Sequence, residues 1–206
     1  MTGQLPLILQ TALRLGMVAG LALLGLPVAG FIAPAPPAQA VTIETYYAPE
    51  DLPADRVVAL YERAGRYIYV AVYGLTYPPV VKALVSAQKR GVDVRVITDR
   101  ERAENPKQEA ALETLHLAGI PIKVNQHDGL MHLKQVVVDD EVNASGSMNH
   151  TTSGNRYNDE RLDVITDHVT SVKAREKFLA MWKDHLRYVD WNKGFGNEYS
   201  YLFDKD

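Results

Sequence analysis

The sequence predicts an α/β domain built on a mixed, mostly parallel sheet flanked by helices on both faces. From residue 41 onward, short apolar and β-branched segments alternate with helical patterns of ten to fifteen residues, the order typical of βαβ units. Glycine or proline separates most of these segments, at the points where helices begin and end. Hydrophobic residues make up 47% of the chain and charged residues 23%, a composition that supplies a sizeable core.

The first forty residues form a separate segment. Arg14 precedes an uncharged run over residues 15–32, and a proline-rich stretch then leads to Ala-Gln-Ala at 38–40, an A-x-A-type cleavage signal. We therefore predict a secretory signal peptide over residues 1–40 and an exported, periplasmic or secreted domain over 41–206. The alternative is a membrane anchor formed by the apolar run, whose length is near the lower limit for a spanning helix.

Strands and helices alternate in the first two thirds of the domain. Strands are predicted over 41–47, 66–74, 92–98 and 120–125, with helices over 54–65, 78–91 and 107–119. Pro78 and Pro79 open the second helix, because proline is favoured in a first turn. Glycine ends each helix, at Gly65, Gly91 and Gly119.

The last third of the domain starts with a predicted antiparallel hairpin. Its strands are 134–139 and 142–147, joined by a turn of acidic residues. A further strand follows over 161–166, and then the longest helix over 168–189. A buried stripe on this helix is predicted to contain Val172, Phe178, Leu179, Trp182 and Leu186. The aromatic tail, residues 191–206, has no assignable pattern.

Composition excludes several kinds of chemistry. The chain has no cysteine, so disulfides, cysteine-ligated zinc, iron–sulfur clusters and a thiol nucleophile are excluded. Its formal net charge is −3, and residues 1–40 hold one arginine and no acid, so the remainder carries −4. A mildly acidic domain argues against a strong nonspecific grip on nucleic acid, although it leaves room for a local basic groove.

The side chains suited to catalysis or ligand binding lie between Met131 and Glu160. His132 and Lys134 are two residues apart, so on a strand their side chains leave the same face. Ser147 and Asn149 have the same spacing at the other end of the predicted hairpin, which would bring the two pairs together. An imidazole, an ammonium group and neutral donors suit an anionic substrate that gains negative charge during reaction, such as a phosphate ester.

The spacing of these residues matches a known pattern. H-x-K-x4-D is formed by His132, Lys134 and Asp139, G-S-x-N by Gly146, Ser147 and Asn149, and Asn-x-Glu by Asn158 and Glu160. This pattern resembles the phospholipase D superfamily, and the resemblance covers residues 42–188. Because the motif occurs once, the chain is most similar to the small bacterial endonuclease branch. The resemblance implies a phospholipase D-like fold and a homodimer in which two identical chains share one active site.

The resemblance also implies roles for the motif residues. His132 would attack phosphorus to form a phosphohistidine, while His132 of the partner subunit would protonate the leaving group. Lys134 and Asn149 would hold the non-bridging oxygens, and Ser147 would donate a supporting hydrogen bond. Glu160 would accept from the opposite ring nitrogen of the histidine. No metal or cofactor is expected, because lysine supplies the positive charge.

Two motif residues are expected to act in support. Asp139 has an odd spacing from His132, so we assign it to the turn rather than to substrate contact. Asn158 belongs to the same short element as Glu160. The alternative to these functional roles is a purely structural one, in which Ser147 and Asn149 serve only as turn residues and Glu160 is a solvated acid.

No metal site is expected from the further histidines. His127 and His150 lie close to His132 in sequence, but the three lack a zinc-site spacing. His150 also stands where members of the resembled family often carry an aromatic residue. The remaining histidines fall within helical patterns and are expected to be ordinary, namely His116, His168 and His185.

The predicted function is that of a metal-independent phosphodiester hydrolase, an endonuclease acting on nucleic acid as a homodimer. One alternative is a phospholipase D acting on phospholipid head groups, which a retained membrane anchor would favour. Another is a non-catalytic nucleic-acid-binding or secretion-associated protein on the same scaffold.

Overall fold

The computed structural model describes residues 40–193, so nearly all of the predicted signal peptide or anchor and most of the aromatic tail lie outside the described residues. The described strands are β1 (Thr42–Ala48), β2 (Tyr67–Val72), β3 (Asp93–Thr98), β4 (Ile122–Asn125), β5 (Lys134–Val138), β6 (Val142–Gly146), β7 (Glu160–Thr166) and β8 (Tyr188–Asp190). The described helices are α1 (Pro53–Arg63), α2 (Pro78–Lys89), α3 (Arg100–Ala103), α4 (Pro106–Leu117), α5 (Thr152–Arg156) and α6 (His168–Lys183).

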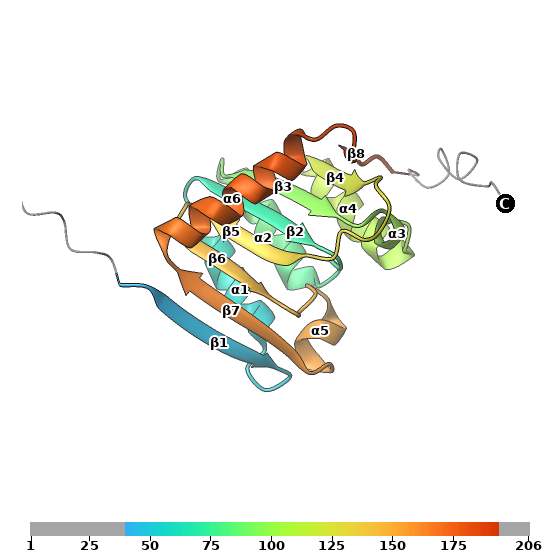
Figure 1. Ribbon diagram of the computed structural model, residues 1–206. Helices are drawn as coiled ribbons and strands as arrows, with labels where there is room; N and C mark the ends of the chain where they lie inside the picture. Colours follow the sequence, from blue (N-terminus) through green and yellow to red (C-terminus); the bar gives the residue numbers. More distant parts are fainter. Residues whose placement is uncertain (1–39, 194–206) are drawn as a thin grey trace, which may run out of the picture. The chain divides into compact units, whose positions relative to one another are not determined.

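All eight strands form one open sheet in the order β1-β7-β6-β5-β2-β3-β4-β8 (Figure 1). The mixed α/β sheet is therefore confirmed, but the prediction that it is mostly parallel is wrong. Only β2–β3 and β3–β4 are parallel, and the other five pairings are antiparallel. Helical crossovers join the strands from β1 to β4, whereas β5, β6 and β7 follow one another as antiparallel neighbours without a long crossover helix.

Helices cover both faces of the sheet, as predicted. Figure 1 shows α6 crossing one face, with α1, α2 and α4 on the other. The central strand β2 is buried along its whole length and divides the core between these layers. Ile68, Val70 and Val72 belong to the larger cluster with α1, α2 and α4, whereas Tyr67 and Tyr69 pack with α6. This alternation is the period-two pattern of a strand buried on both sides.

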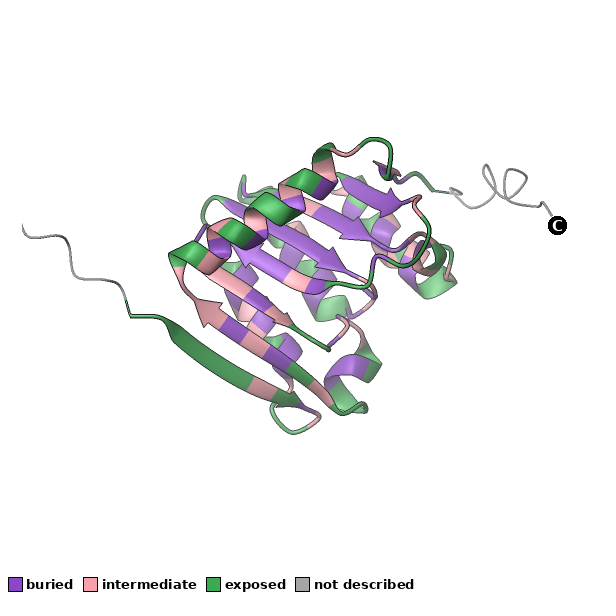
Figure 2. Ribbon diagram, in the orientation of Figure 1, coloured by how far each residue is buried: buried purple, intermediate pink, exposed green. Residues whose placement is uncertain are grey.

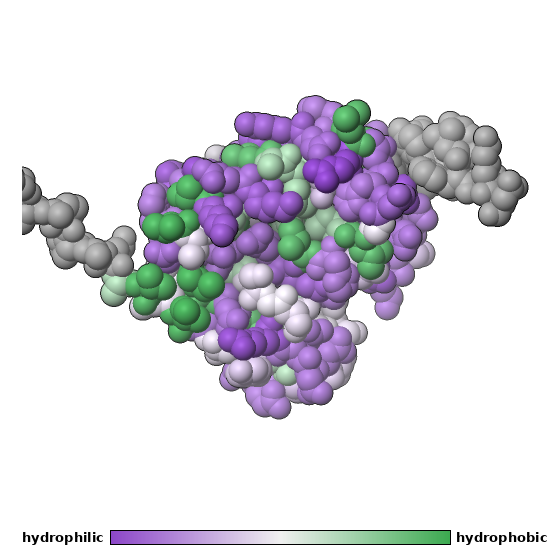
Figure 3. Space-filling model, viewed as in Figure 1, coloured by the Kyte–Doolittle hydropathy of each residue, from purple (hydrophilic) through white to green (hydrophobic). Residues whose placement is uncertain are grey.

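The edge strand β1 differs from the buried centre. Among the described strands it pairs only with β7, and most of its residues are exposed (Figure 2). Apolar side chains on the face seen in Figure 3 occur as separate patches, and one lies at the start of β1, where Val41 and Ile43 are exposed. No helix within residues 40–193 is long and apolar enough to cross a membrane.

The end of the domain departs from the prediction. α6 ends at Lys183 rather than at residue 189, because the Asp184 carboxylate accepts hydrogen bonds from the backbone N–H groups of Leu186 and Arg187 and turns the chain. The next residues form β8 beside β4. Leu186 is therefore 87% exposed and not part of the buried stripe. The fully buried residues of α6 are Ser171, Ala174, Phe178 and Met181, whereas Leu179 and Trp182 are partly buried and Val172 is half-buried.

Candidate active site

The sheet topology brings the predicted site residues to one edge. β2 and β6 end there, and β5 and β7 begin there, because β5 is antiparallel to β2 and β6 is antiparallel to both β5 and β7. Lys134 is thus paired with Val72, and Gly146 with Leu162. One cavity of about 420 Å³ at this edge is lined by His132, Lys134, Gly146, Ser147, Asn149 and Glu160. The predicted hairpin does bring the two halves of the motif together.

His132 and Lys134 contact each other directly. The Lys134 Nζ lies 3.0 Å from each ring nitrogen of His132 and also donates to its carbonyl oxygen at 2.9 Å. An ammonium group can only donate, so at most one of these two ring contacts, the one to the nitrogen without a proton, is a hydrogen bond. Burial lowers the pKa of Lys134, and the nearby Glu160 carboxylate partly opposes that shift. The imidazole also lies against Tyr73, with 4.8 Å between the ring centroids.

The Asn149 amide is oriented by the end of β2. Its Oδ1 accepts a hydrogen bond of 3.0 Å from the backbone N–H of Gly74. That bond fixes which end of the amide is the acceptor, so the Nδ2 group is the one left to donate to a substrate oxygen. A side chain at position 74 would crowd Asn149, since a Cβ there would lie 3.3 Å from the asparagine side chain.

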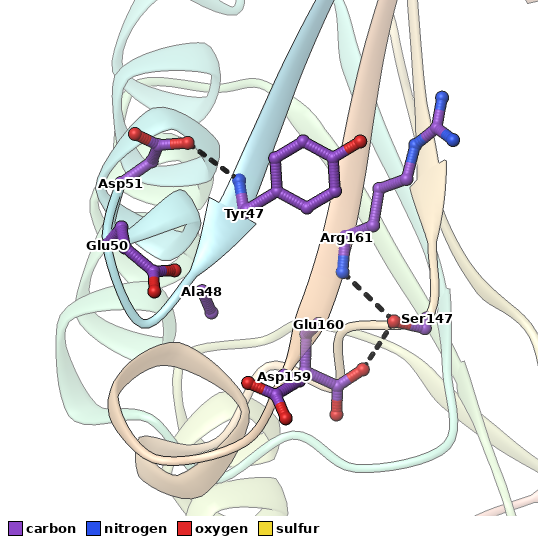
Figure 4. Close-up of a pocket in the computed structure, with 8 residues that line it drawn as sticks. All are labelled: Tyr47, Ala48, Glu50, Asp51, Ser147, Asp159, Glu160 and Arg161. Atoms are coloured by element: carbon purple, nitrogen blue, oxygen red, sulfur yellow. Dashed lines mark hydrogen bonds between the residues drawn. The ribbon is translucent and has the colours of Figure 1, made fainter.

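Ser147 and Glu160 form a hydrogen-bonded unit that differs from the prediction (Figure 4). The Ser147 hydroxyl donates to Glu160 at 2.5 Å and accepts from the backbone N–H of Arg161 at 3.0 Å. Asn158 donates to the other Glu160 oxygen at 3.2 Å. The supporting hydrogen bond predicted for Ser147 is therefore directed to Glu160, which it holds in place.

Glu160 likewise has different partners from those expected. Among residues 40–193 its carboxylate accepts from Ser147 and Asn158, and not from the ring of His132. The cause is the register of the sheet, because Glu160 starts β7, two strands away from β5. Its negative charge acts instead on the Lys134 ammonium.

Asp139 lies at the far end of β5, away from the cavity. Its carboxylate accepts from the backbone N–H groups of Gly65, Arg66 and Tyr67 at 2.7 to 2.9 Å. Its backbone has a φ of 56°, in the left-handed region that turns allow for aspartate. Asp139 therefore ties the hairpin turn to the start of β2.

Steric crowding explains why the motif has a glycine at position 146. A Cβ at Gly146 would collide with the backbone carbonyl of Arg161 on β7. The close approach of these strands lets the Ser147 N–H donate to the Arg161 carbonyl at 3.0 Å. Only glycine permits the spacing that places Ser147 beside Glu160.

The other histidines near the motif do not join the cavity. His150 is buried, and its backbone carbonyl accepts from the N–H groups of Thr76 and Tyr77. His127 packs edge-on against Tyr188. In the described part of the chain, no three His, Cys, Asp or Glu side chains are grouped so as to hold a metal ion.

Two larger hollows flank the cavity. One, of about 610 Å³, shares Ser147 and Glu160 with it and also contains Glu50, Asp51 and Asp159 (Figure 4). The other, of about 590 Å³, shares Asn149 and is lined by hydroxyl and basic side chains. The site thus lies between an acidic hollow and a basic one.

The motif pattern missed three residues near the site. Tyr73 and Gly74 follow β2, and Arg102 lies in α3, directly after β3. The Arg102 guanidinium carbon is 5.5 Å from the centre of the Tyr73 ring. The predicted strand order could have indicated these residues. Ligands of open α/β sheets bind outside the carboxyl ends of the strands, and all three residues follow such ends.

This geometry combines a histidine nucleophile or base, a buried ammonium group and an oriented amide donor. Such a set can bind a phosphate group and stabilise additional negative charge on it. A family model described as "Cardiolipin synthase, PLD-like domain" matches residues 57–182, and the chain belongs to this phospholipase D superfamily.

Individual relatives agree with that assignment. The chain is 33% identical to a phospholipase D of Rickettsia prowazekii, over 61% of this chain and 58% of that protein. It is 34% identical to a mitochondrial cardiolipin hydrolase of Xenopus tropicalis, over 63% of this chain and 61% of that protein. The chain therefore spans about three fifths of the length of these relatives.

A solved structure supports the same fold. The phospholipase D family member Nuc from Salmonella typhimurium matches with a TM-score of 0.69 and 27% identity, covering 74% of this chain and 99% of Nuc. The predicted family and fold class are confirmed by these matches.

Proposed function

We propose that the chain is a phosphodiester hydrolase that acts as an endonuclease and works as a homodimer. The observation that carries the proposal is the contact between His132 and Lys134, in one cavity with the Asn149 amide. A positive charge and a neutral donor beside an imidazole are the groups that nucleophilic attack on a phosphodiester requires. Membership of the phospholipase D superfamily supports the same reaction.

The proposed reaction has two steps. In the first, a ring nitrogen of His132 bonds to phosphorus, and the bond to the leaving oxygen breaks as His132 of the partner subunit donates its proton. In the second, the same partner histidine takes a proton from water, whose oxygen attacks phosphorus and releases His132. Lys134 and the Asn149 amide hold the non-bridging oxygens in both steps.

The homodimer is proposed because one cavity holds one imidazole. His132 is the single histidine among the described residues that line it. The nucleophile and the acid must stand on opposite sides of phosphorus, so a second imidazole has to come from another chain. The surface beside His132 suits contact with a partner, since Leu130 and Leu133 are 48% and 37% exposed.

The first experiment measures hydrolysis of bis(p-nitrophenyl) phosphate by the purified chain in excess EDTA. Activity is expected to persist, and His132→Ala should abolish it. His116→Ala is the matched control, because that histidine is exposed on α4, away from the cavity. Loss of activity on chelation, with recovery on adding a divalent metal, would contradict the proposed chemistry.

A mixing experiment tests the shared site. Wild-type chain and His132→Ala chain are denatured together, refolded at a constant total concentration and assayed. If two chains form one site, activity follows the square of the wild-type fraction, because every mixed dimer lacks one histidine. A linear dependence would show that each chain works alone.

A phospholipase D activity is the second candidate. The relatives in Rickettsia and Xenopus bear the names phospholipase D and cardiolipin hydrolase, and the exposed Leu130 and Leu133 beside His132 could equally contact lipid. Single-stranded DNA and vesicles containing phosphatidylcholine or cardiolipin, assayed side by side, separate the two activities. Head-group release without DNA cleavage would replace the endonuclease proposal.

Export of the protein is proposed as well. The cleavage signal at 38–40 supports it. Amino-terminal sequencing of the mature protein should start at Val41, and a chain that keeps residues 15–32 and sediments with membranes would favour the anchor.

A further inference from the structure

The basic hollow beside Asn149 adjoins the catalytic cavity, because Asn149 lines both. It has a volume of about 590 Å³ and is bordered by Tyr73, which packs on His132. Arg102 and Lys107 line it, together with several hydroxyl groups, and within residues 40–193 no carboxylate does. A phosphate group held at Asn149 would therefore have uncompensated positive charge on this side.

Arg102 brings a buried and unpartnered donor to the wall of this hollow. Its Nε is buried and has no hydrogen-bond partner within residues 40–193, where its side chain also forms no ion pair. The Tyr73 ring centre lies 5.5 Å from the guanidinium carbon. A buried donor without an acceptor is costly, and a ligand oxygen would remove that cost.

The backbone around Arg102 is firmly held. Asp99 caps α3 by accepting from the Arg102 N–H at 3.2 Å, and its other oxygen accepts from the Met131 N–H at 2.9 Å. The second bond joins α3 to the segment that carries His132. The position of Arg102 relative to the reacting histidine is therefore set by the fold and not by a mobile loop.

The opposite hollow would repel the same ligand. Glu50, Asp51, Asp159 and Glu160 line it, and its one arginine, Arg161, forms an ion pair with Asp163 at 2.9 Å. A substrate with several phosphates would extend away from these carboxylates and toward Arg102. The asymmetry of charge thus selects one side of the cavity.

We propose that this hollow is a subsite for the phosphate next to the cleaved one in a nucleic-acid strand, with Arg102 as its ligand. The inference rests on the proposed endonuclease function and names the substrate as a strand with at least two adjacent phosphodiesters. Because Nε is buried in this structure, the Arg102 side chain would rotate to present Nε and one Nη to phosphate oxygens, in the bidentate contact that guanidinium groups favour. Lys107, exposed at the start of α4, adds charge at the outer rim.

The test compares two substrates with the purified chain. One is a dithymidine monophosphate, which has a single phosphodiester, and the other is a ten-residue oligothymidylate. Arg102→Ala should lower kcat/KM on the oligonucleotide about tenfold more than on the dinucleotide, and reduce the salt dependence of oligonucleotide binding by about one phosphate contact. Arg63→Ala is the matched control, because Arg63 is an exposed arginine in the last turn of α1, at the opposite edge of the sheet.

A second measurement does not depend on the folding of the variant. Neutral methylphosphonates replace the flanking phosphates of the oligonucleotide one at a time, on either side of a single cleavable linkage. For wild type, kcat/KM should fall about tenfold when the methylphosphonate stands at one flanking position. For Arg102→Lys, which keeps the charge but not the bidentate contact, kcat/KM should fall less at that position.

The outcomes separate the two proposals. Equal losses of Arg102→Ala on both substrates, or no sensitive methylphosphonate position, would overturn the subsite while leaving the endonuclease in place. Hydrolysis of bis(p-nitrophenyl) phosphate without cleavage of either nucleotide substrate would overturn the endonuclease proposal, and the subsite with it.

Discussion

Replacing His150 with phenylalanine should make the stability of the protein less sensitive to acid. The His150 ring is 1% exposed, and its Nδ1 has no hydrogen-bond partner among residues 40–193. Burial lowers the pKa of His150 from 6.5 to about 4, because a charged imidazole would lose its hydration there. Phenylalanine keeps an aromatic ring at this position and cannot be protonated.

The sign and size follow from proton linkage. Below pH 6.5 the unfolded chain takes up a proton on His150, whereas the folded chain does so only near pH 4. A fall in pH through this window therefore favours unfolding, by up to about 1.4 kcal/mol per pH unit and about 3 kcal/mol in total. Above pH 6.5 His150 is neutral in both the folded and the unfolded state, so its protonation no longer lowers the free energy of unfolding.

The assay is urea unfolding of wild type and His150→Phe at a series of pH values from 7.5 to 4. Carboxylates titrate in both proteins, so the informative quantity is the difference between the two free energies of unfolding, which should change by about 3 kcal/mol across the window. Any constant cost of fitting the larger ring cancels in this slope. His116→Asn, at an exposed position, is the matched control for the loss of a histidine. A constant difference between wild type and His150→Phe would refute a buried, neutral imidazole.

Three further substitutions test other parts of the site and its support. Gly146→Ala should destabilise the protein by about 3 kcal/mol in urea unfolding, because its Cβ meets the Arg161 carbonyl; a loss below about 1 kcal/mol would show that the strands can separate cheaply. Asp139→Ala should cost about 3 kcal/mol by removing the acceptor of three backbone N–H groups, while leaving KM of the folded fraction unchanged; a raised KM would mean that the turn acts on the site. The rate of wild type should fall at alkaline pH as Lys134 loses its proton, at a lower pH than for an ordinary lysine, and Lys134→Arg should move that fall upward; a fall at the same pH in both would exclude Lys134 as its cause.

The sequence predicted the hairpin and the gathering of His132, Lys134 and Asn149, because fixed spacing and strand alternation determine which ends of neighbouring strands meet. The hydrogen-bond partner of the Ser147 hydroxyl could not be predicted from the sequence, since it depends on the register between β6 and β7. Helix-like periodicity also extended α6 too far, because a pattern of apolar residues does not reveal the turn made by Asp184. Arg102 does not belong to the sequence motif. It lies near the site because β2 and β3 are parallel neighbours, so that the residues that follow them meet at the same end of the sheet.

The gathering of the site at one edge of the sheet leaves the opposite edge open to spectroscopic labels. Lys89 ends α2 at that opposite edge and is exposed. Since the chain contains no cysteine, Lys89→Cys would introduce its sole thiol. One spin label or fluorophore per chain would then report the separation of the two subunits of the proposed homodimer directly, without a reporter group near His132. The same sample could be followed during turnover, so that assembly and catalysis are observed together.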